Sequence, residues 1–457
     1  MEETLIERLY ELYIMHPEVT TDSRRCPAGS MFFALKGESF DGNLFAAKAL
    51  EAGSAVAVVD KPDVIPSGDE RYVLVPDVLH ALQTLAAFHR KHFTKPVLQV
   101  TGTNGKTTTK ELLAAVLSQR FHVLYTQGNL NNHIGVPLTL LRLRPEEHEI
   151  AIIETGANHP GEIAFLTDIV QPDYGLVTNV GRAHIEGFGS FEGVKHTKGE
   201  LYDFLGRKET ARIFVNGSSK DLCIMLKERQ IGILSGKCIV YGHDAEQQLG
   251  WTCSGSVLSC NPMLRCRWKS AHEDIHDVNT RLIGDYNIDN VLAAVAVGLH
   301  FGVSAEDICM ALENYQPSLG RSEYRKTAHN ELIVDAYNAN LTSMMAALEN
   351  FKRIDHQRKM VILGDMRELG QESEEAHQTI VRKVMDGMKD NIDKAWFVGL
   401  NFAKASEGTP VVKGKEIRCF ADVEAVKEAL KHEIPKGCLI LIKGSNGTKL
   451  FQLPELL

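Results

Sequence analysis

The chain has 457 residues, of which 44% are hydrophobic and 24% charged, an ordinary composition for a globular protein. At roughly 150 residues per domain, this length predicts three domains rather than one. The formal net charge is −9, from 50 Lys and Arg against 59 Asp and Glu, which argues against a general nucleic-acid or membrane-surface binder. A local lysine or a helix N-terminus can still bind an anionic ligand in an acidic protein.

Targeting and redox features of the sequence indicate the cytoplasm. The N-terminus is acidic and lacks an apolar segment, so we expect no signal peptide. No apolar run is long enough to span a bilayer. The nine cysteines are scattered and none has C-x-x-C spacing, which favours free thiols over disulfides or a metal site. We therefore expect a cytoplasmic protein without a membrane span.

The hydrophobic pattern divides the chain into three α/β domains. In the first domain, short strands at residues 31–35 and 55–59 lie on either side of an alanine-rich helix. Asp77 can cap a second helix, whose apolar residues fall at helical spacing. The pair Lys95-Pro96 then interrupts the pattern, because the residue before a proline avoids the helical conformation. The predicted domains cover residues 1–95, 96–318 and 319–457.

The second and third domains both alternate strands with helices, which is typical of mostly parallel sheets. Residues 208–280 are less regular, with short β-like runs, and a helix follows at 286–300. The second domain is predicted to contain strands at 97–100, 149–153 and 174–178. The third is predicted to contain strands at 332–334, 359–363, 396–398 and 438–442, with helices at 373–388 and 421–432. A small doubly wound, Rossmann-like sheet accounts for this last pattern.

A glycine-rich loop follows the first strand of the second domain and opens a helix. Glycines there let backbone N–H groups close around phosphates, and the helix N-terminus adds positive potential. Lys106 can reach the β- and γ-phosphates, and the Thr107 hydroxyl can bind Mg²⁺. The spacing G-x-x-G-K-T is two residues shorter than the general P-loop, but the strand before it and the helix after it favour nucleotide binding over a chance turn. The loop is Thr101, Gly102, Thr103, Asn104, Gly105, Lys106, Thr107 and Thr108.

Three more residues of the second domain are candidates for the chemistry. Glu154 ends a strand where a parallel sheet presents its ligand-binding edge, so it can hold Mg²⁺, although it could equally be an ordinary strand-end charge. His184 follows the next strand and is a candidate metal ligand, although a lone histidine is more often structural. Lys198, taken alone, is only a solvated lysine.

Several motifs follow one another along nearly the whole chain, from about Asp22 to Gly447. They are the segments 101–108, Gly128–Thr139, Glu154–His159, Asp335–Asn340 with Ser343 and Met344, and Gly364–Gly370. Together these motifs resemble the Mur ligase family and the related folylpolyglutamate synthetases. Within the family, they are most similar to those of the members that join D-alanyl-D-alanine to UDP-N-acetylmuramoyl-tripeptide.

The resemblance implies a fold and an activity. The first domain would be a small α/β domain that binds the UDP end of the substrate, the second a P-loop ATPase-type domain, and the third a Rossmann-like domain. The implied reaction uses ATP and Mg²⁺ to form an amide bond through an acyl phosphate, in peptidoglycan precursor synthesis. UDP-N-acetylmuramoyl-tripeptide and D-alanyl-D-alanine would be the partners, and we expect a monomer.

The resemblance also implies roles for individual residues. The sister ligases carbamylate the lysine that aligns with Lys198, and Asn43 and Tyr286 stand where the family shows histidine. Implied substrate-binding residues are Ser23, Lys36, Asp41, Asn131 and Asn132. Implied metal ligands are Thr107, Glu154, His184 and Lys198. Implied ATP-binding residues are Gly102 to Thr108, Asn287, Asn290, Arg321 and Asp335. Implied catalytic residues are Lys106, His184, Lys198 and Arg321.

Three alternatives remain beside this assignment. The sister ligase that adds a diamino acid to UDP-N-acetylmuramoyl-dipeptide shares the expected fold and mechanism, but its Asp-Asn-Pro-Arg motif is absent here. A folylpolyglutamate synthetase would lack the segment Gly128–Thr139 and the extra N-terminal domain. A P-loop switch or motor belongs to another class, and it would hydrolyse ATP without an acyl acceptor.

Overall fold

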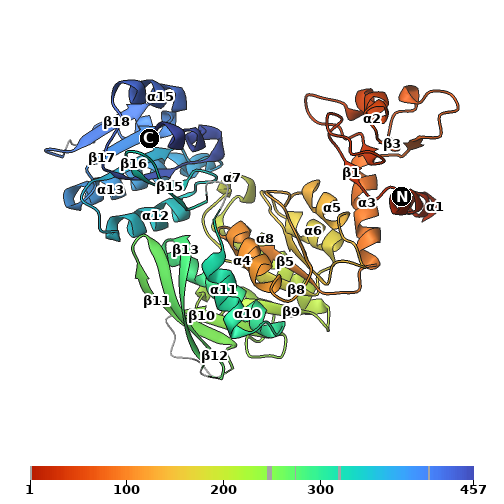
Figure 1. Ribbon diagram of the computed structural model, residues 1–457, viewed down its shortest axis with the longest axis horizontal. Coiled ribbons are helices and arrows are strands. Elements are labelled where there is room, and N and C mark those ends of the chain that lie inside the picture. The colour runs from red at the N-terminus through yellow and green to blue at the C-terminus, as the bar shows by residue number, and fades with distance from the viewer. Residues whose placement is uncertain (1–2, 244–249, 273, 318–320, 410–411) are drawn as a thin grey trace.

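The computed structural model describes residues 3–243, 250–272, 274–317, 321–409 and 412–457. These residues form three sheets in chain order, each covered by helices (Figure 1). The predicted α/β class with three parts is confirmed. The predicted boundary at 318/319 lies outside the described residues, as does Gly320. In the part of the chain that the structure describes, no helix combines the length and apolarity needed to cross a membrane.

The N-terminal unit contains a four-stranded parallel sheet in the order β1-β2-β3-β4. Its strands are β1 (Val19–Thr20), β2 (Met31–Phe33), β3 (Val56–Val59) and β4 (Tyr72–Leu74). Its helices are α1 (Glu3–Met15), α2 (Ala46–Glu51) and α3 (Val78–Lys91). The Asp77 carboxylate accepts the backbone N–H of His80, so α3 begins at the predicted cap.

The central unit contains a nine-stranded sheet in the order β13-β12-β11-β10-β9-β8-β5-β7-β6. Its strands are β5 (Val97–Thr101), β6 (Val123–Tyr125), β7 (Ile150–Glu154), β8 (Tyr174–Val177), β9 (Arg212–Asn216), β10 (Cys238–His243), β11 (Cys253–Cys260), β12 (Met263–Ser270) and β13 (Ile275–Ile283). Its helices are α4 (Lys106–Leu117), α5 (Gly135–Leu140), α6 (Glu162–Val170), α7 (Ile185–Phe188), α8 (Phe191–Arg207), α9 (Lys220–Glu228), α10 (Ile288–His300) and α11 (Ala305–Asn314). The irregular region 208–280 therefore extends the parallel sheet by β9 to β11 and then turns back in antiparallel strands.

The C-terminal unit contains a six-stranded sheet in the order β14-β15-β19-β16-β17-β18, parallel except for the edge strand β14. Its strands are β14 (Glu323–Lys326), β15 (Glu331–Asp335), β16 (Lys359–Gly364), β17 (Lys394–Val398), β18 (Glu416–Phe420) and β19 (Leu439–Lys443). Its helices are α12 (Leu341–Arg353), α13 (Ser373–Asp390), α14 (Leu400–Ala405) and α15 (Val423–His432). The structure thus contains the Rossmann-like sheet that the sequence predicts.

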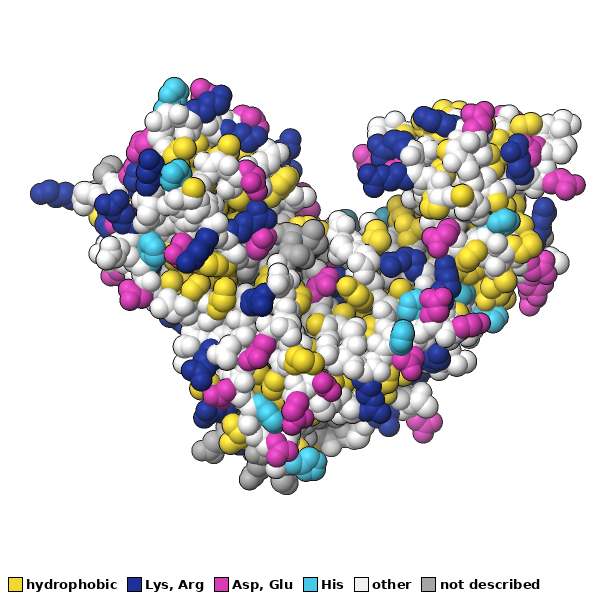
Figure 2. All heavy atoms as spheres, in the orientation of Figure 1, with side chains coloured by type: hydrophobic (Ala, Val, Ile, Leu, Met, Phe, Trp, Pro, Cys, Tyr) yellow, Lys and Arg dark blue, Asp and Glu magenta, His cyan; other side chains and the backbone are white. Residues whose placement is uncertain are grey.

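The N-terminal unit shares a hydrophobic core with the central unit, whereas the C-terminal unit has separate cores. One cluster of buried side chains runs from α1, α3 and the N-terminal sheet into β7, α5 and α6 of the central unit. The C-terminal unit has clusters of its own, to which, among the described residues, the central unit contributes only Ile283. Figure 2 shows the result: the N-terminal and C-terminal units stand apart on the central unit, with a deep hollow between them.

Candidate active site

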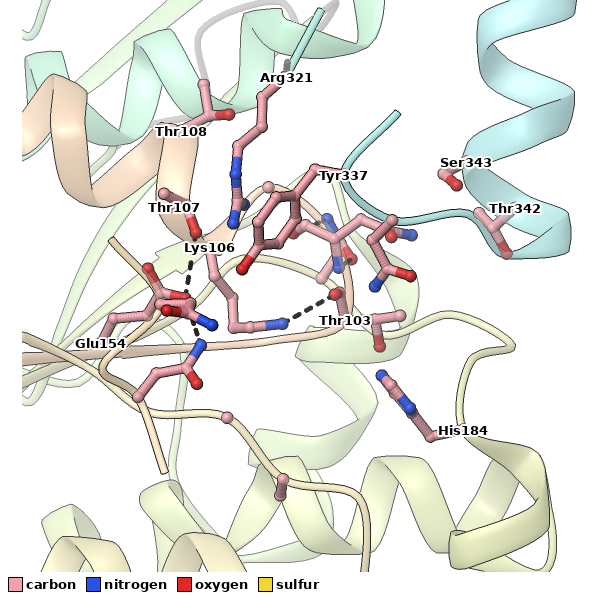
Figure 3. A pocket seen from close by; sticks show the side chains of 18 of the residues that line it. Thr103, Lys106, Thr107, Thr108, Glu154, His184, Arg321, Tyr337, Thr342 and Ser343 are labelled. Atoms are coloured by element: carbon pink, nitrogen blue, oxygen red, sulfur yellow. Dashed lines mark hydrogen bonds between the residues drawn. The ribbon is translucent and has the colours of Figure 1, made fainter. Parts of the chain in front are cut away.

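A cavity of about 730 Å³ lies where the carboxyl ends of the central parallel strands meet the C-terminal unit. It is the kind of crevice in which open α/β sheets bind ligands. Of the residues singled out from the sequence, the following line it: Thr103 to Thr108, Asn131, Asn132, Glu154, His184, Asn287, Asn290, Arg321 and Asp335. Figure 3 labels Lys106, Glu154 and Arg321 among them.

The phosphate loop is held in place by glycine geometry and by the end of β8. Gly102 has φ 141°, and a Cβ there would lie 2.1 Å from the Thr178 hydroxyl. Gly105 has the left-handed φ 77° and directly precedes α4. The backbone N–H of Asn104 donates to the Asn179 side chain at 3.0 Å, and the Thr178 hydroxyl donates to the Asn104 carbonyl at 2.7 Å. The loop is therefore fixed before any ligand binds.

Lys106 is half-buried in this loop. Its ammonium group donates to the carbonyls of Gly102 and Thr103, at 2.9 Å each (Figure 3). Burial lowers the pKa of Lys106, and the charge of Glu154 opposes that shift while Arg321 adds to it. The cation therefore lies at the helix N-terminus, where a phosphate is expected to bind.

Glu154 forms the acidic side of the cavity and is 1% exposed. Its Oε1 accepts hydrogen bonds from the Thr107 hydroxyl at 3.1 Å and from the Asn131 amide at 2.8 Å. Its buried Oε2 has no hydrogen-bond partner. A free carboxylate oxygen beside a hydroxyl suits Mg²⁺, which prefers oxygen ligands and keeps several waters. Over the described residues, no group of three His, Cys, Asp or Glu side chains gathers into a ready-made metal cage.

His184 and Lys198 lie on the α7–α8 side of the site. His184 precedes α7 with a left-handed φ of 52°, and its Nδ1 contacts the Glu368 carboxylate of the C-terminal unit. Burial lowers the pKa of His184, which favours the neutral ring. Lys198 is 2% exposed, so the interpretation of it as a solvated lysine is wrong, and it does not line the cavity. Burial, with a smaller effect from the charge of Lys106, lowers the pKa of Lys198 to about 7.

Two asparagines line the cavity beside the phosphate loop. Asn290 lies in α10, where its Oδ1 accepts from the Thr109 hydroxyl at 2.9 Å and its amide donates to Asn287 at 2.8 Å. Asn287 belongs to a 3₁₀ turn before α10, and its side chain makes no capping bond. Its amide donates instead to the Ile283 carbonyl. Asn287 therefore does not cap α10, and the two asparagine side chains form one chain of hydrogen bonds along the cavity wall.

The C-terminal unit closes the cavity with charged and polar groups. The Arg321 guanidinium stacks 3.8 Å above the Tyr337 ring, and its buried Nε has no hydrogen-bond partner. Asp335 is paired with Lys443 at 2.5 Å. The Asn340 amide donates to the side chain of Asn104 at 2.8 Å, so the C-terminal unit touches the phosphate loop directly.

Comparisons with known proteins place the chain in a family. The profiles for the Mur ligase family catalytic domain, middle domain and glutamate ligase domain match residues 17–90, 100–298 and 320–446. The UDP-N-acetylmuramoyl-tripeptide–D-alanyl-D-alanine ligase of Escherichia coli K12 is 36% identical over 94% of this chain and 91% of its own length. The chain belongs to the Mur ligase family.

Two further Mur ligases match over almost their whole lengths. The Bacillus subtilis 168 protein of the same name is 33% identical over 98% of this chain and 94% of its own length. The crystal structure of MurF from Acinetobacter baumannii covers 98% of this chain and 97% of its own, with a TM-score of 0.82 and 31% identity. The similarity to the Acinetobacter baumannii structure therefore extends over all three units of the chain.

The residues that the Mur ligase resemblance implies for UDP binding do not line the cavity. Ser23, Lys36 and Asp41 lie in the N-terminal unit. In Figure 2 a deep hollow separates this unit from the C-terminal unit. Lys36 is paired with Asp60 at 2.8 Å, and Asp41 is paired with Lys61. The Asn43 side chain, which replaces the family histidine, is buried and hydrogen-bonds both Asp41 and Asp60. The Asn43 side chain therefore links Asp41 to Asp60 by hydrogen bonds and stabilises this part of the N-terminal unit.

Sequence reasoning missed four groups that shape the site: Tyr337 under Arg321, Asn340 against Asn104, Lys443 against Asp335, and Glu368 against His184. Tyr337, Asn340 and Glu368 lie in segments that carry the family resemblance, and Lys443 is the last residue of β19. The sequence identified the segments but did not show which side chains they bring to the central unit.

Proposed function

We propose that this Mur ligase joins D-alanyl-D-alanine to UDP-N-acetylmuramoyl-tripeptide, with consumption of ATP, in peptidoglycan precursor synthesis. The observation that carries the proposal is the near full-length similarity, at 33% and 36% identity, to two relatives that bear this name. The cavity supports it, because a phosphate loop faces a basic group from a separate unit across a space large enough for a nucleotide and an acyl group.

In the first step, the carboxylate of the tripeptide attacks the γ-phosphorus of ATP and ADP leaves, which produces an acyl phosphate. Lys106 would exchange the carbonyls of Gly102 and Thr103 for phosphate oxygens and neutralise part of the charge that develops on them. Arg321 would approach the same phosphates from the C-terminal unit, since its Nε is buried and unpaired. Asn287 and Asn290 would contact the adenosine, and Asp335 the ribose.

Mg²⁺ would be held by the Thr107 hydroxyl and by Glu154, whose Oε2 is free to accept it. When bound, the ion would supply charge neutralisation at the phosphates. His184 could add a nitrogen ligand. Lys198 could contribute only as a carbamate, because an ammonium group repels a cation.

In the second step, the amine of D-alanyl-D-alanine attacks the acyl carbon, loses a proton and expels inorganic phosphate as the amide bond forms. Water would destroy the acyl phosphate, so the reaction needs a closed site. Contacts such as Asn340 to Asn104 complete the enclosure from the C-terminal unit. All the groups come from one chain, which is consistent with a functional monomer.

The experiment is to measure phosphate release from Mg·ATP with UDP-N-acetylmuramoyl-tripeptide, with and without D-alanyl-D-alanine. We expect rapid release only when both co-substrates are present. Parallel reactions would replace the dipeptide with L-lysine, diaminopimelate or glutamate. Release that requires one of these acceptors would move the enzyme to a sister step, and equal release without any acceptor would overturn the ligase assignment.

A further inference from the structure

Arg321 is a cation that the C-terminal unit brings to the cavity without a carboxylate partner. Over the described residues, its side chain forms no ion pair, and its buried Nε has no hydrogen-bond partner. Its charge acts on Lys106 across the cavity and helps to lower the pKa of that lysine. Two like charges that face the same cavity repel each other. Another contact must therefore hold the arginine in this position.

The ring of Tyr337, in the loop between β15 and α12, supplies that contact. The Arg321 Cζ lies 3.8 Å from the centre of the ring, whereas the other contacts of this kind among the described residues measure 4.7 to 6.0 Å. In Figure 3 the Arg321 side chain extends toward Lys106 with the Tyr337 ring beside it. The negative face of an aromatic ring attracts a guanidinium group. The stack covers one face of that group and leaves free the N–H edges that bind phosphate oxygens.

The main chain beside Arg321 is held by a different tyrosine. The hydroxyl groups of Ser322 and Tyr286 share a hydrogen bond of 3.1 Å, which joins the C-terminal unit to the central unit. Ser322 has a left-handed φ of 50°. A residue other than glycine keeps such a conformation only where the surrounding structure fixes it. The freedom that Arg321 retains is therefore in its side chain, and the Tyr337 ring restricts it.

We infer that Tyr337 is a positioning residue for Arg321: the face of its ring holds the guanidinium group in the cavity with the N–H edges free for the phosphates of ATP. The inference rests on the proposed function in that Arg321 binds these phosphates. The Tyr337 hydroxyl makes no hydrogen bond with a described residue, so the ring face carries the role. An arginine that is already ordered loses less side-chain entropy when the nucleotide binds.

Binding of Mg·ATP to the full-length protein, measured by isothermal titration calorimetry, tests the inference without a ligase assay. Tyr337→Leu removes the aromatic face and should weaken ATP binding by about 5–30-fold. Tyr337→Phe keeps the ring and should bind ATP like the wild type. Tyr324→Leu is the matched control and should also bind like the wild type, because Tyr324 lies in the same unit, does not line the cavity and hydrogen-bonds Glu331.

The decisive comparison is a double-mutant cycle with Arg321→Ala. If Tyr337 acts through Arg321, Tyr337→Leu should weaken ATP binding no further in the Arg321→Ala background. The same loss in both backgrounds, the same loss in Tyr337→Phe as in Tyr337→Leu, or wild-type affinity in Tyr337→Leu would overturn the inference. Unfolding midpoints without nucleotide check that each variant folds, and Tyr337→Met takes the place of Tyr337→Leu if the latter does not.

Phosphate release with all co-substrates separates this inference from the proposed function. Tyr337→Leu should raise KM for ATP and leave KM for D-alanyl-D-alanine near the wild-type value, because the stack acts on the arginine that binds phosphate. An active ligase without coupling between Tyr337 and Arg321 would refute the inference alone. Coupling in a protein that has no ligase activity would refute the proposed reaction alone, and a wild type that does not bind ATP would refute both.

Discussion

At the scale of single residues, the groups proposed to bind ATP are already in position without a ligand. The Lys106 ammonium group donates hydrogen bonds to carbonyls of its own loop, and the Thr107 hydroxyl donates one to the Glu154 carboxylate. Both contacts can be exchanged for ligand contacts with a small movement of the side chain, because the backbone is already fixed by Gly102, Gly105 and Asn179. Such preorganisation favours electrostatic stabilisation of the transition state.

Replacement of Lys106 by alanine tests this assignment. Lys106→Ala removes the cation at the N-terminus of α4, and we expect phosphate release to fall on the order of 10²–10³-fold, as on loss of another preorganised charge-stabilising donor. Lys195→Ala is the control, because Lys195 is paired with Glu192 and Asp221 on another part of the surface. Wild-type release by Lys106→Ala would contradict the phosphate-loop assignment.

At the scale of elements, α13 anchors the loop 364–370, which reaches the central unit. His377 is fully buried in α13, where its Nδ1 donates to the Ser373 carbonyl and its Nε2 accepts from the backbone N–H of Met366. Only a neutral ring can make both bonds. Burial is the main reason that the pKa of His377 lies below its ordinary value of 6.5. The anchoring of the loop therefore depends on an uncharged histidine.

The stability of the C-terminal unit should consequently depend on pH. The unfolded chain binds the proton of His377 more readily than the folded chain, so this contribution is complete above pH 6.5 and is lost as pH falls below 6.5 and through the lower folded pKa. Urea unfolding followed by Trp396 fluorescence, in a Trp251→Phe, Trp268→Phe background, measures it. Midpoints should be lower at about pH 5.5 than at about pH 7.5. The same difference in a His377→Gln variant would contradict the assignment to this residue.

At the scale of the whole molecule, the two outer units are attached in different ways. The N-terminal unit shares a continuous apolar core with the central unit, and α3 packs on both α5 and α6. The Arg144 guanidinium adds bonds to Tyr13 and to the Pro17 carbonyl. The C-terminal unit is joined by polar and ionic contacts, such as Arg353 to Asp285 and Asn340 to Asn104. Apolar burial resists separation, whereas exposed ionic contacts exchange readily with water.

Two matched core deletions should separate these behaviours. Leu85 in α3 and Leu348 in α12 are both buried, and truncation of either to alanine should cost about 2–5 kcal/mol. We expect Leu85→Ala to reduce hydrogen-exchange protection in β3 and β7 together, because one cluster contains both strands. Leu348→Ala should affect β16 and leave β7 protected. Loss of protection confined to the N-terminal sheet in Leu85→Ala would contradict a shared core.

The local features of this Mur ligase could be predicted from its amino-acid sequence. The phosphate loop, the cap at Asp77 and the alternation of strands and helices depend on residues close together in the chain, so spacing and residue type were sufficient to predict them. The family motifs also identified the segments that meet at the cavity. The weakly patterned region 208–280 was the exception, because β11, β12 and β13 are defined by their pairing with one another.

The side-chain contacts between the units could not be predicted in the same way and are seen in the folded molecule. The contacts of Asn340 with Asn104 and of Glu368 with His184 join residues more than 180 positions apart, and they depend on how the C-terminal unit docks. The hydrophobic core shared by the first two units could not be predicted from the sequence either, because an apolar residue does not indicate which other residues it packs against. Local pattern encodes the parts of the site, whereas packing of whole units decides their contacts.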